Sequence, residues 1–258
     1  MLKIERTVLP SPEQWEIIIE GLRNPMNSWD KMDSDYRNVL ERVCDACPES
    51  NLPFGRDCED CDINAIPRDK FLLGPNDLGL MKKLAKGGAV HAKYRRMIPL
   101  YVTITAPLYW WKEFDTYKVG TVANSCSTMH KIHAKEFTID DFSHEHLLDS
   151  YDDELELVDQ NGIGTKILVT TKSMMEIIMN TLNYYRQMYI DTKEKKYWWQ
   201  MIQLLPTSYN QKRTVMLNYE VLVGMYRDRK AHKLDEWHTF CDWIEGLPYS
   251  ELITGKGE

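Results

Sequence analysis

The chain of 258 residues lacks any apolar run that approaches the roughly 18 residues of a membrane-spanning helix. Its opening residues, MLKIERTVLP, also lack the hydrophobic core of a signal peptide. We therefore expect a cytoplasmic protein without membrane contact. In that compartment its six cysteines would be thiols, metal ligands or redox groups rather than structural disulfides.

A surplus of basic residues is missing as well, because 39 Asp and Glu outnumber 32 Lys and Arg and give a formal net charge of -7. General nucleic-acid binding requires basic side chains that neutralise phosphates, so this function is not expected, although basic residues could still gather locally. We see no internal repeat, low-complexity tract or interdomain linker. The length and the ordinary hydrophobic content of 43% predict a single domain over residues 1–258 with a core of its own.

Hydrophobic spacing predicts both helices and strands. Crowded β-branched and aromatic residues at 98–105 predict a strand, which Ala106-Pro107 ends before a helix from Leu108. The same approach predicts strands at 3–9 and 213–217, a turn-rich acidic connector at 149–162, and helices at 12–23, 34–43, 76–86, 138–142, 171–189, 192–204, after Asn218 and from Glu236. These elements predict an α+β fold in which several long helices pack around a small central, mainly antiparallel sheet.

A polar segment follows the helix that begins at Leu108. It concentrates donors, acceptors and titratable groups: Lys112, Glu113, Asp115, Thr116, Tyr117, Lys118, Thr121, Asn124, Ser125, Cys126, Ser127, Thr128 and His130. A chain that needed only a core would not gather them there, so this segment is the first candidate for a ligand site.

Two basic groups lie elsewhere in the sequence. His91, Arg95 and Arg96 precede the central strand and form either a solvated connector or an anion-binding edge, since arginine binds phosphate and carboxylate with a matching fork. The second group gathers at the end of the helix after Asn218: Arg227, Arg229, Lys230, His232 and Lys233. Cations at that end also offset the helix dipole without any ligand.

Two paired-cysteine motifs, Cys44-x-x-Cys47 and Cys58-x-x-Cys61, suggest a metal site. Four thiolates can hold one tetrahedral zinc ion, and a closed set of four protein ligands would make that zinc structural. We expect a zinc-knuckle insertion at 44–61. Free thiols on a surface excursion, or a redox pair, are the alternatives. Trp29 is likewise open to two interpretations: an anchor packed on the core, which we favour, or part of a ligand wall.

The order of these motifs resembles that of the flavin-dependent thymidylate synthases. The resemblance covers about residues 76–245 and rests on Ala106-Pro107, on Asn124-Ser125-Cys126-Ser127 as the serine turn, on Leu205-Pro206-Thr207, and on Asn218 followed by Arg229 at the family's separation. The segments NSWDK, EFDTYKVGT and HKLDEW also resemble a prophage-type relative.

Several arginines of the family are replaced in this chain. Thr116-Tyr117-Lys118 stands where the family has Arg-His-Arg, Thr128 or Met129 stands at the end of the serine turn, and Ile202 precedes Leu205-Pro206. The family implies that those arginines hold flavin and nucleotide phosphates. The reaction of this chain is therefore expected to be dUMP C5 methylation or a related C5 modification.

The resemblance implies a fold like that of these enzymes, FAD, methylenetetrahydrofolate, a pyrimidine nucleotide and a homotetramer. It implies that Arg229, Ser127 and Lys118 act at the nucleotide, and that the flavin or the base lies near four further residues: Asn218, His232, His91 and Asn124. Cys126 is expected to be a buried structural thiol, with covalent addition to a pyrimidine as the alternative. The rival hypothesis is a catalytically silent phage or mobile-element protein that keeps the scaffold as a nucleotide-binding or interaction module.

Overall fold

A computed structural model describes residues 1–37, 70–150, 155–157 and 167–256. Their Cα framework divides into two compact units. The first unit contains residues 1–7, 101–216 and 229–243, and the second contains 8–100, 217–228 and 244–258. Each unit thus draws on three separate stretches of the chain. Among the helices in the described ranges, none combines the length and the apolar character that a membrane crossing requires.

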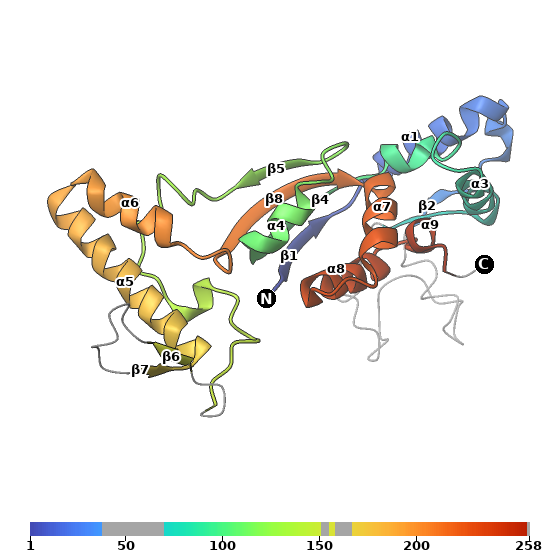
Figure 1. Cartoon of the computed structure of the whole chain (residues 1–258). Coiled ribbons are helices and arrows are strands. Elements are labelled where there is room, and N and C mark those ends of the chain that lie inside the picture. The colour runs from blue at the N-terminus through green and yellow to red at the C-terminus, as the bar shows by residue number, and fades with distance from the viewer. Residues whose placement is uncertain (38–69, 151–154, 158–166, 257–258) are drawn as a thin grey trace, which may run out of the picture. The chain divides into compact units, whose positions relative to one another are not determined.

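A four-stranded sheet forms the centre of the first unit, with the strand order β1-β4-β8-β5 (Figure 1). The strands are β1 (Lys3–Val8), β4 (Pro99–Pro107), β8 (Asn210–Asn218) and β5 (Val122–Ser125). Edge strand β5 pairs antiparallel with β8 and places Ser125 opposite Arg213. The α+β expectation is confirmed, but Asn124 and Ser125 extend an edge strand instead of forming a turn.

Two helices of the first unit share an aromatic core. Helix α4 (Leu108–Phe114) supplies Trp110, and helix α8 (Asp235–Glu245) supplies Trp237 and Phe240. The ring centroid of Trp110 lies 4.8 Å from that of Trp237 and 5.6 Å from that of Phe240, and all three side chains are fully buried. Burial of such large rings stabilises this pairing of helices.

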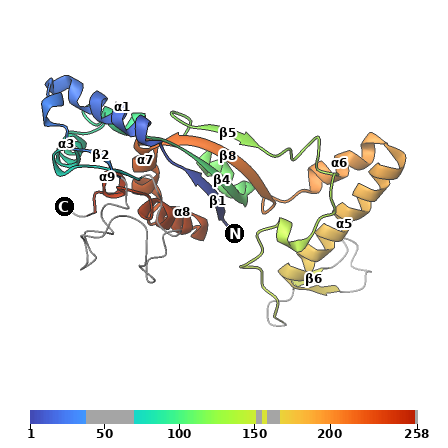
Figure 2. The same ribbon diagram turned by 180° about the vertical axis from the view of Figure 1, so that it is seen from behind.

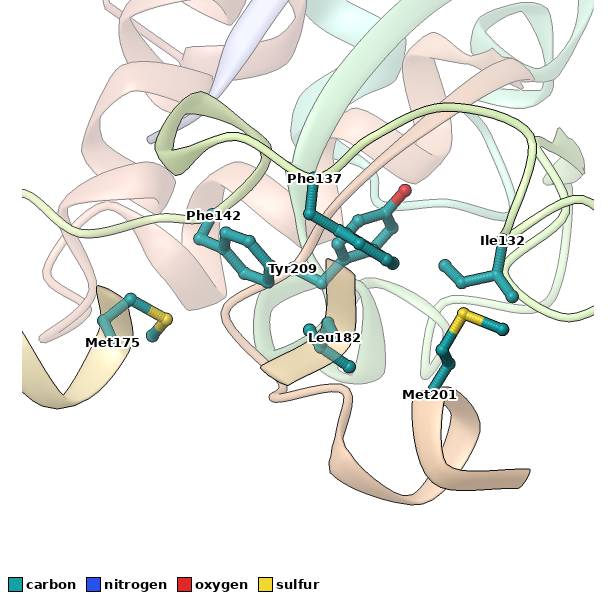
Figure 3. Close-up of a cluster of buried hydrophobic side chains, with 7 residues drawn as sticks. All are labelled: Ile132, Phe137, Phe142, Met175, Leu182, Met201 and Tyr209. Atoms are coloured by element: carbon teal, nitrogen blue, oxygen red, sulfur yellow. The ribbon is translucent and has the colours of Figure 1, made fainter. Parts of the chain in front are cut away.

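A second core lies under the helical hairpin of α5 (Thr171–Thr192) and α6 (Lys195–Leu204). Figure 3 shows its buried side chains: Ile132, Phe137, Phe142, Met175, Leu182, Met201 and Tyr209. The short helix predicted at 138–142 is present as η4 (Ile139–Asp141). Strands β6 (Leu155–Leu157) and β7 (Ile167–Val169) pair antiparallel. The acidic connector predicted at 149–162 therefore contains a strand, β6, which its acidic composition did not indicate.

The second unit carries α1 (Pro12–Arg23), α3 (Pro75–Lys86), most of α7 (Tyr219–Arg229) and α9 (Glu251–Thr254) (Figure 2). Its shorter elements are η1 (Asn24–Met26), η2 (Trp29–Lys31), η3 (Lys93–Met97), β2 (Asp35–Arg37) and β3 (Lys70–Leu72). A capping box that joins Ser11 and Gln14 starts α1, as the serine followed by proline predicts.

Two predictions in the second unit are wrong. Residues 35–37 form β2, which pairs antiparallel with β3, instead of the first turn of a helix. Backbone pairing with a distant strand has overridden the local start signal of Ser34. Trp29 is 47% exposed and donates from Nε1 to Asn24 Oδ1 at 2.9 Å, so it is not a core anchor.

Candidate functional site

The carboxylate of Glu113 is the centre of a polar cluster in the first unit. Glu113 lies in the last turn of α4, and its Oε2 accepts from Arg229 Nη1 at 2.8 Å and from Trp237 Nε1 at 2.8 Å. His232 Nε2 lies 3.3 Å from the same oxygen. Two N–H donors and one ring nitrogen from the C-terminal part of the chain therefore converge on one atom of the predicted polar segment.

Aromatic rings hold the guanidinium of Arg229 in place. Its carbon lies 4.8 Å from the ring centroid of Trp237 and 5.5 Å from that of Tyr117, and its Nε donates to Tyr117 Oη at 2.9 Å. A guanidinium stacked on rings and bonded to a carboxylate has little freedom to reorient. The side chain of Arg229 is only 17% exposed.

Both ring nitrogens of His232 have a neighbour in the first unit. The backbone N–H of Leu234 donates to His232 Nδ1 at 3.2 Å, so this nitrogen is an acceptor. The other nitrogen, Nε2, lies 3.3 Å from Glu113 Oε2.

A second arginine lies beside the end of α4. Arg213 of β8 pairs with Asp115 at 2.7 Å and donates from Nε to Gln211 Oε1 at 2.9 Å. Its guanidinium carbon lies over the ring of Trp111, 4.2 Å from the centroid. Gln211 in turn donates from Nε2 to the carbonyl of Cys126 at 2.9 Å, which fixes the end of β5. Each of these two arginines is thus matched by a carboxylate at the end of α4.

A separate buried group joins the other ends of the same helices. Tyr109 of α4 donates its hydroxyl to Glu236 of α8, and the same hydroxyl lies 3.1 Å from Ser143 Oγ. Burial, and then the hydrogen bond to Glu236, raise the pKa of Tyr109 above its ordinary value. The phenol therefore stays protonated at neutral pH and serves as a donor that joins α4 to α8.

Of the predicted site residues, Arg229 and His232 meet at Glu113. Ser127 lies in an exposed turn, where its Oγ accepts from the backbone N–H of His130 at 2.9 Å. Asn124 is exposed on β5, and Lys118 is exposed and forms no ion pair with any described residue. Contacts that would draw these three side chains into the cluster are absent from the described part of the first unit.

Two other predicted residues belong to the second unit. Asn218 accepts from the backbone N–H of Val221 at 3.1 Å, so its side chain caps α7 as expected. His91 is exposed in the turn that follows α3. Neither residue lines any of three cavities among the described residues, which have volumes of about 420, 630 and 470 Å³.

The sequence interpretation did not single out Glu113, Tyr117 or Trp237 as partners of Arg229. The sequence offered one signal for Glu113: it is one of two carboxylates, with Asp115, between Leu108 and Lys118, within the polar segment that was the first candidate site. Cys126 also differs from expectation, since it is exposed rather than buried.

The predicted zinc ligands, Cys44, Cys47, Cys58 and Cys61, lie outside the described residues. Within the ranges that are described, no group of three or more His, Cys, Asp or Glu side chains is arranged to hold a metal ion. The zinc site stays a prediction from the sequence.

Comparison with known proteins gives a match at the level of structure. No protein-family model and no curated protein matches the sequence. A crystal structure of thymidylate synthase X from Helicobacter pylori with FAD and dUMP is similar over 99% of this chain and 96% of that one, with a TM-score of 0.56 and 12% identity. The chain has the fold of thymidylate synthase X. A second structure of that enzyme with the same two ligands gives a TM-score of 0.53 at 11% identity, covering 99% of this chain and 97% of the other.

The cluster offers recognition more than acid–base chemistry. Its charged groups, Glu113 and Arg229, offset one another, and Nδ1 of its histidine is engaged by the Leu234 backbone N–H. Such a group can orient a ligand through hydrogen bonds and ring contacts. The four residues predicted to lie near the flavin or the base are divided between the two units: Asn124 and His232 belong to the first, and His91 and Asn218 to the second.

Proposed function

We propose that this chain is a flavin-dependent enzyme that binds a pyrimidine nucleotide and modifies its base, with C5 methylation of dUMP or a related C5 modification as the reaction. The observation that supports this most is the fold, which follows an enzyme solved with FAD and dUMP across nearly the whole of both chains. In such a protein FAD would supply the redox chemistry, and the protein would orient the nucleotide. Methylenetetrahydrofolate is the proposed carbon donor.

Arg229 is the residue on which we would first test nucleotide binding. It is the predicted nucleotide ligand that the structure holds in a defined orientation, between Tyr117 and Trp237. Arg229→Gln keeps much of the side-chain length but removes the charge. If Arg229 contacts the nucleotide, this change weakens dUMP binding at least tenfold, whereas Arg227→Gln, two positions earlier on the exposed side of α7, leaves it unchanged.

The absorption spectrum of the purified protein tests the flavin. Flavin bands in the protein as purified, or after addition of FAD and gel filtration, would support the enzyme. Release of the C5 proton of dUMP in the presence of the reduced protein would extend the proposal to the reaction. A colourless protein that neither retains FAD nor releases this proton would overturn it.

A silent binding module is the second candidate, and the engagement of the candidate groups with one another favours it. Arg229 is paired with Glu113, and both nitrogens of His232 are occupied. A module predicts that dUMP binds and stabilises the protein against thermal unfolding while the C5 proton is retained. Thermal unfolding with dUMP, together with the assay for C5 proton release, thus separates the enzyme from the binding module.

We further propose a structural zinc site and a homotetramer. Four thiolates at Cys44, Cys47, Cys58 and Cys61 would form a closed structural site. Metal analysis of the wild type against Cys58→Ser tests it, and a zinc content near zero in both would remove the idea. A homotetramer predicts a mass near four times 30.4 kDa by light scattering.

A further inference from the structure

The guanidinium of Arg229 already has an anion beside it, and that anion is a side chain of the same unit. Glu113 Oε2 lies 2.8 Å from Arg229 Nη1 and also receives the Trp237 indole N–H. His232 Nε2 lies 3.3 Å from the same oxygen. Convergent N–H donors such as those of Arg229 and Trp237 form the arrangement in which proteins hold a phosphate or carboxylate oxygen. Here Glu113 fills that position.

The charge of this region is balanced in the same way on both sides of the end of α4. Asp115 neutralises Arg213 at 2.7 Å, as Glu113 neutralises Arg229. A phosphate brought to Arg229 would meet the carboxylate of Glu113 at short range and would be repelled by it. Lys118 is exposed and forms no ion pair in the described part of the chain, so it can still attract the charged end of a ligand.

The cluster retains capacity for an uncharged ligand. Glu113 Oε1 accepts no hydrogen bond from any described residue, and 33% of the side chain is exposed. A guanidinium has five N–H donors, of which Arg229 uses one on Nε and one on Nη1. The acceptor Glu113 Oε1 and the remaining N–H donors of Arg229 therefore belong to one ion pair. Together they complement the edge of a pyrimidine base, in which an N–H group adjoins a carbonyl oxygen or a ring nitrogen.

We propose that Glu113 is the specificity-determining residue of this cluster: it keeps phosphate away from Arg229 and leaves the pair to read the amide edge of a pyrimidine base. This inference deepens the proposed function and, for the base, rests on it. The part that concerns phosphate depends only on Glu113 and Arg229.

Inorganic phosphate tests the first part, by isothermal titration of the full-length chain at low ionic strength. Glu113→Gln is expected to bind phosphate at least tenfold more tightly than the wild type, because the competing charge is gone. The matched control is Glu136→Gln, which removes one negative charge from an exposed position of the same unit and should behave as the wild type. Adding Arg229→Gln to Glu113→Gln should abolish the gain.

Three results would overturn the first part. They are equal phosphate affinity of Glu113→Gln and the wild type, including no binding by either; an equal gain in Glu136→Gln; and a gain that survives the loss of Arg229. If Glu113→Gln does not fold, the wild type still decides the matter. Phosphate binding that Arg229→Gln weakens tenfold would show that phosphate reaches Arg229 in the presence of Glu113.

A pair of nucleotides tests the base, with the FAD-supplemented protein. The wild type is expected to bind dUMP at least tenfold more tightly than N3-methyl-dUMP, because the methyl group replaces the N3–H that would donate to Glu113. Glu113→Gln should narrow this ratio. If the wild type binds both nucleotides with equal affinity, the proposal that Glu113 and Arg229 bind the base is overturned, and the proposed function is not affected. Failure to bind either nucleotide overturns it together with the proposed function, while the phosphate titration still reports on Glu113.

Discussion

Arg23 and Asp77 form an ion pair in the interior of the second unit, with 2.6 Å between Arg23 Nε and Asp77 Oδ1. The two side chains are 4% and 0% exposed. Asp77 Oδ2 also accepts from the backbone N–H groups of Asp33 and Ser34, at 3.0 and 2.8 Å, and from the Ser34 hydroxyl at 2.6 Å. One carboxylate thus joins α1, α3 and the segment before β2.

Replacement of this carboxylate is expected to be strongly destabilising. Asp77→Asn removes the charge opposite Arg23 and leaves a buried cation uncompensated, because Arg23 Nη2 has no hydrogen-bond partner among the described residues. The loss of unfolding free energy should be about 3 to 5 kcal/mol. Urea unfolding measures it. The exposed pair of Asp149 and Lys172 supplies the control, since Asp149→Asn should change the midpoint little. Equal effects of the two substitutions would show that burial does not set the cost.

The same carboxylate predicts how stability depends on pH. Burial raises the pKa of Asp77, but hydrogen bonds from Ser34, from the Asp33 backbone and from Arg23 outweigh it and hold the pKa below its ordinary value. A depressed folded pKa gives stability that is present above the unfolded pKa of about 3.9 and is lost as the pH falls through the folded value. Urea unfolding from pH 6 to pH 2 should therefore bring the wild type closer to Asp77→Asn. Parallel curves would contradict this.

Two glycines of α3 and its cap are expected to respond oppositely to alanine. A Cβ on Gly74 would lie 2.2 Å from the Asp33 backbone oxygen and 2.2 Å from Asp33 Oδ1. The Asp33 carboxylate accepts from the N–H groups of Asn76 and Asp77, at 2.8 and 3.0 Å, and so satisfies the free start of the helix. Gly74→Ala must displace it, at a cost of about 1 to 3 kcal/mol.

Gly79 is the matched control in the same helix. A Cβ there meets no atom within 4 Å, and the residue is exposed. Gly79→Ala should raise stability by up to about 1 kcal/mol, because alanine favours the helix interior. Thermal unfolding of both variants checks the pair, and destabilisation by both would count against the role of Asp33.

The elements that the sequence predicted best are those defined by local chemistry. Ser11 before Pro12 starts α1, the crowded apolar residues of 98–105 form β4, and Asn218 caps α7. Prediction was wrong where the partner is distant in sequence. Ser34 reads locally as a helix cap, yet its hydroxyl and N–H bond to Asp77, and β2 pairs with β3 more than thirty positions later.

The same limit applies to the candidate site. Arg229 and His232 were predicted from the family resemblance, but nothing local shows that Glu113, 116 positions before Arg229, lies against them. Their meeting depends on the packing of α8 on α4 through Trp110 and Trp237. Such a contact becomes visible only when the fold is known.

The two tryptophans of that contact give a test of how the cluster is held. Both are fully buried, but Trp237 Nε1 donates to Glu113, whereas Trp110 Nε1 has no partner among the described atoms. Replacement of either by phenylalanine loses similar volume. Trp237→Phe also loses the bond to a carboxylate, whereas Trp110→Phe removes an unsatisfied buried donor. Trp237→Phe should therefore be the more destabilising by about 1 to 3 kcal/mol in urea unfolding. Equal losses would mean that packing alone joins α4 to α8 and that the Glu113 bond adds nothing measurable.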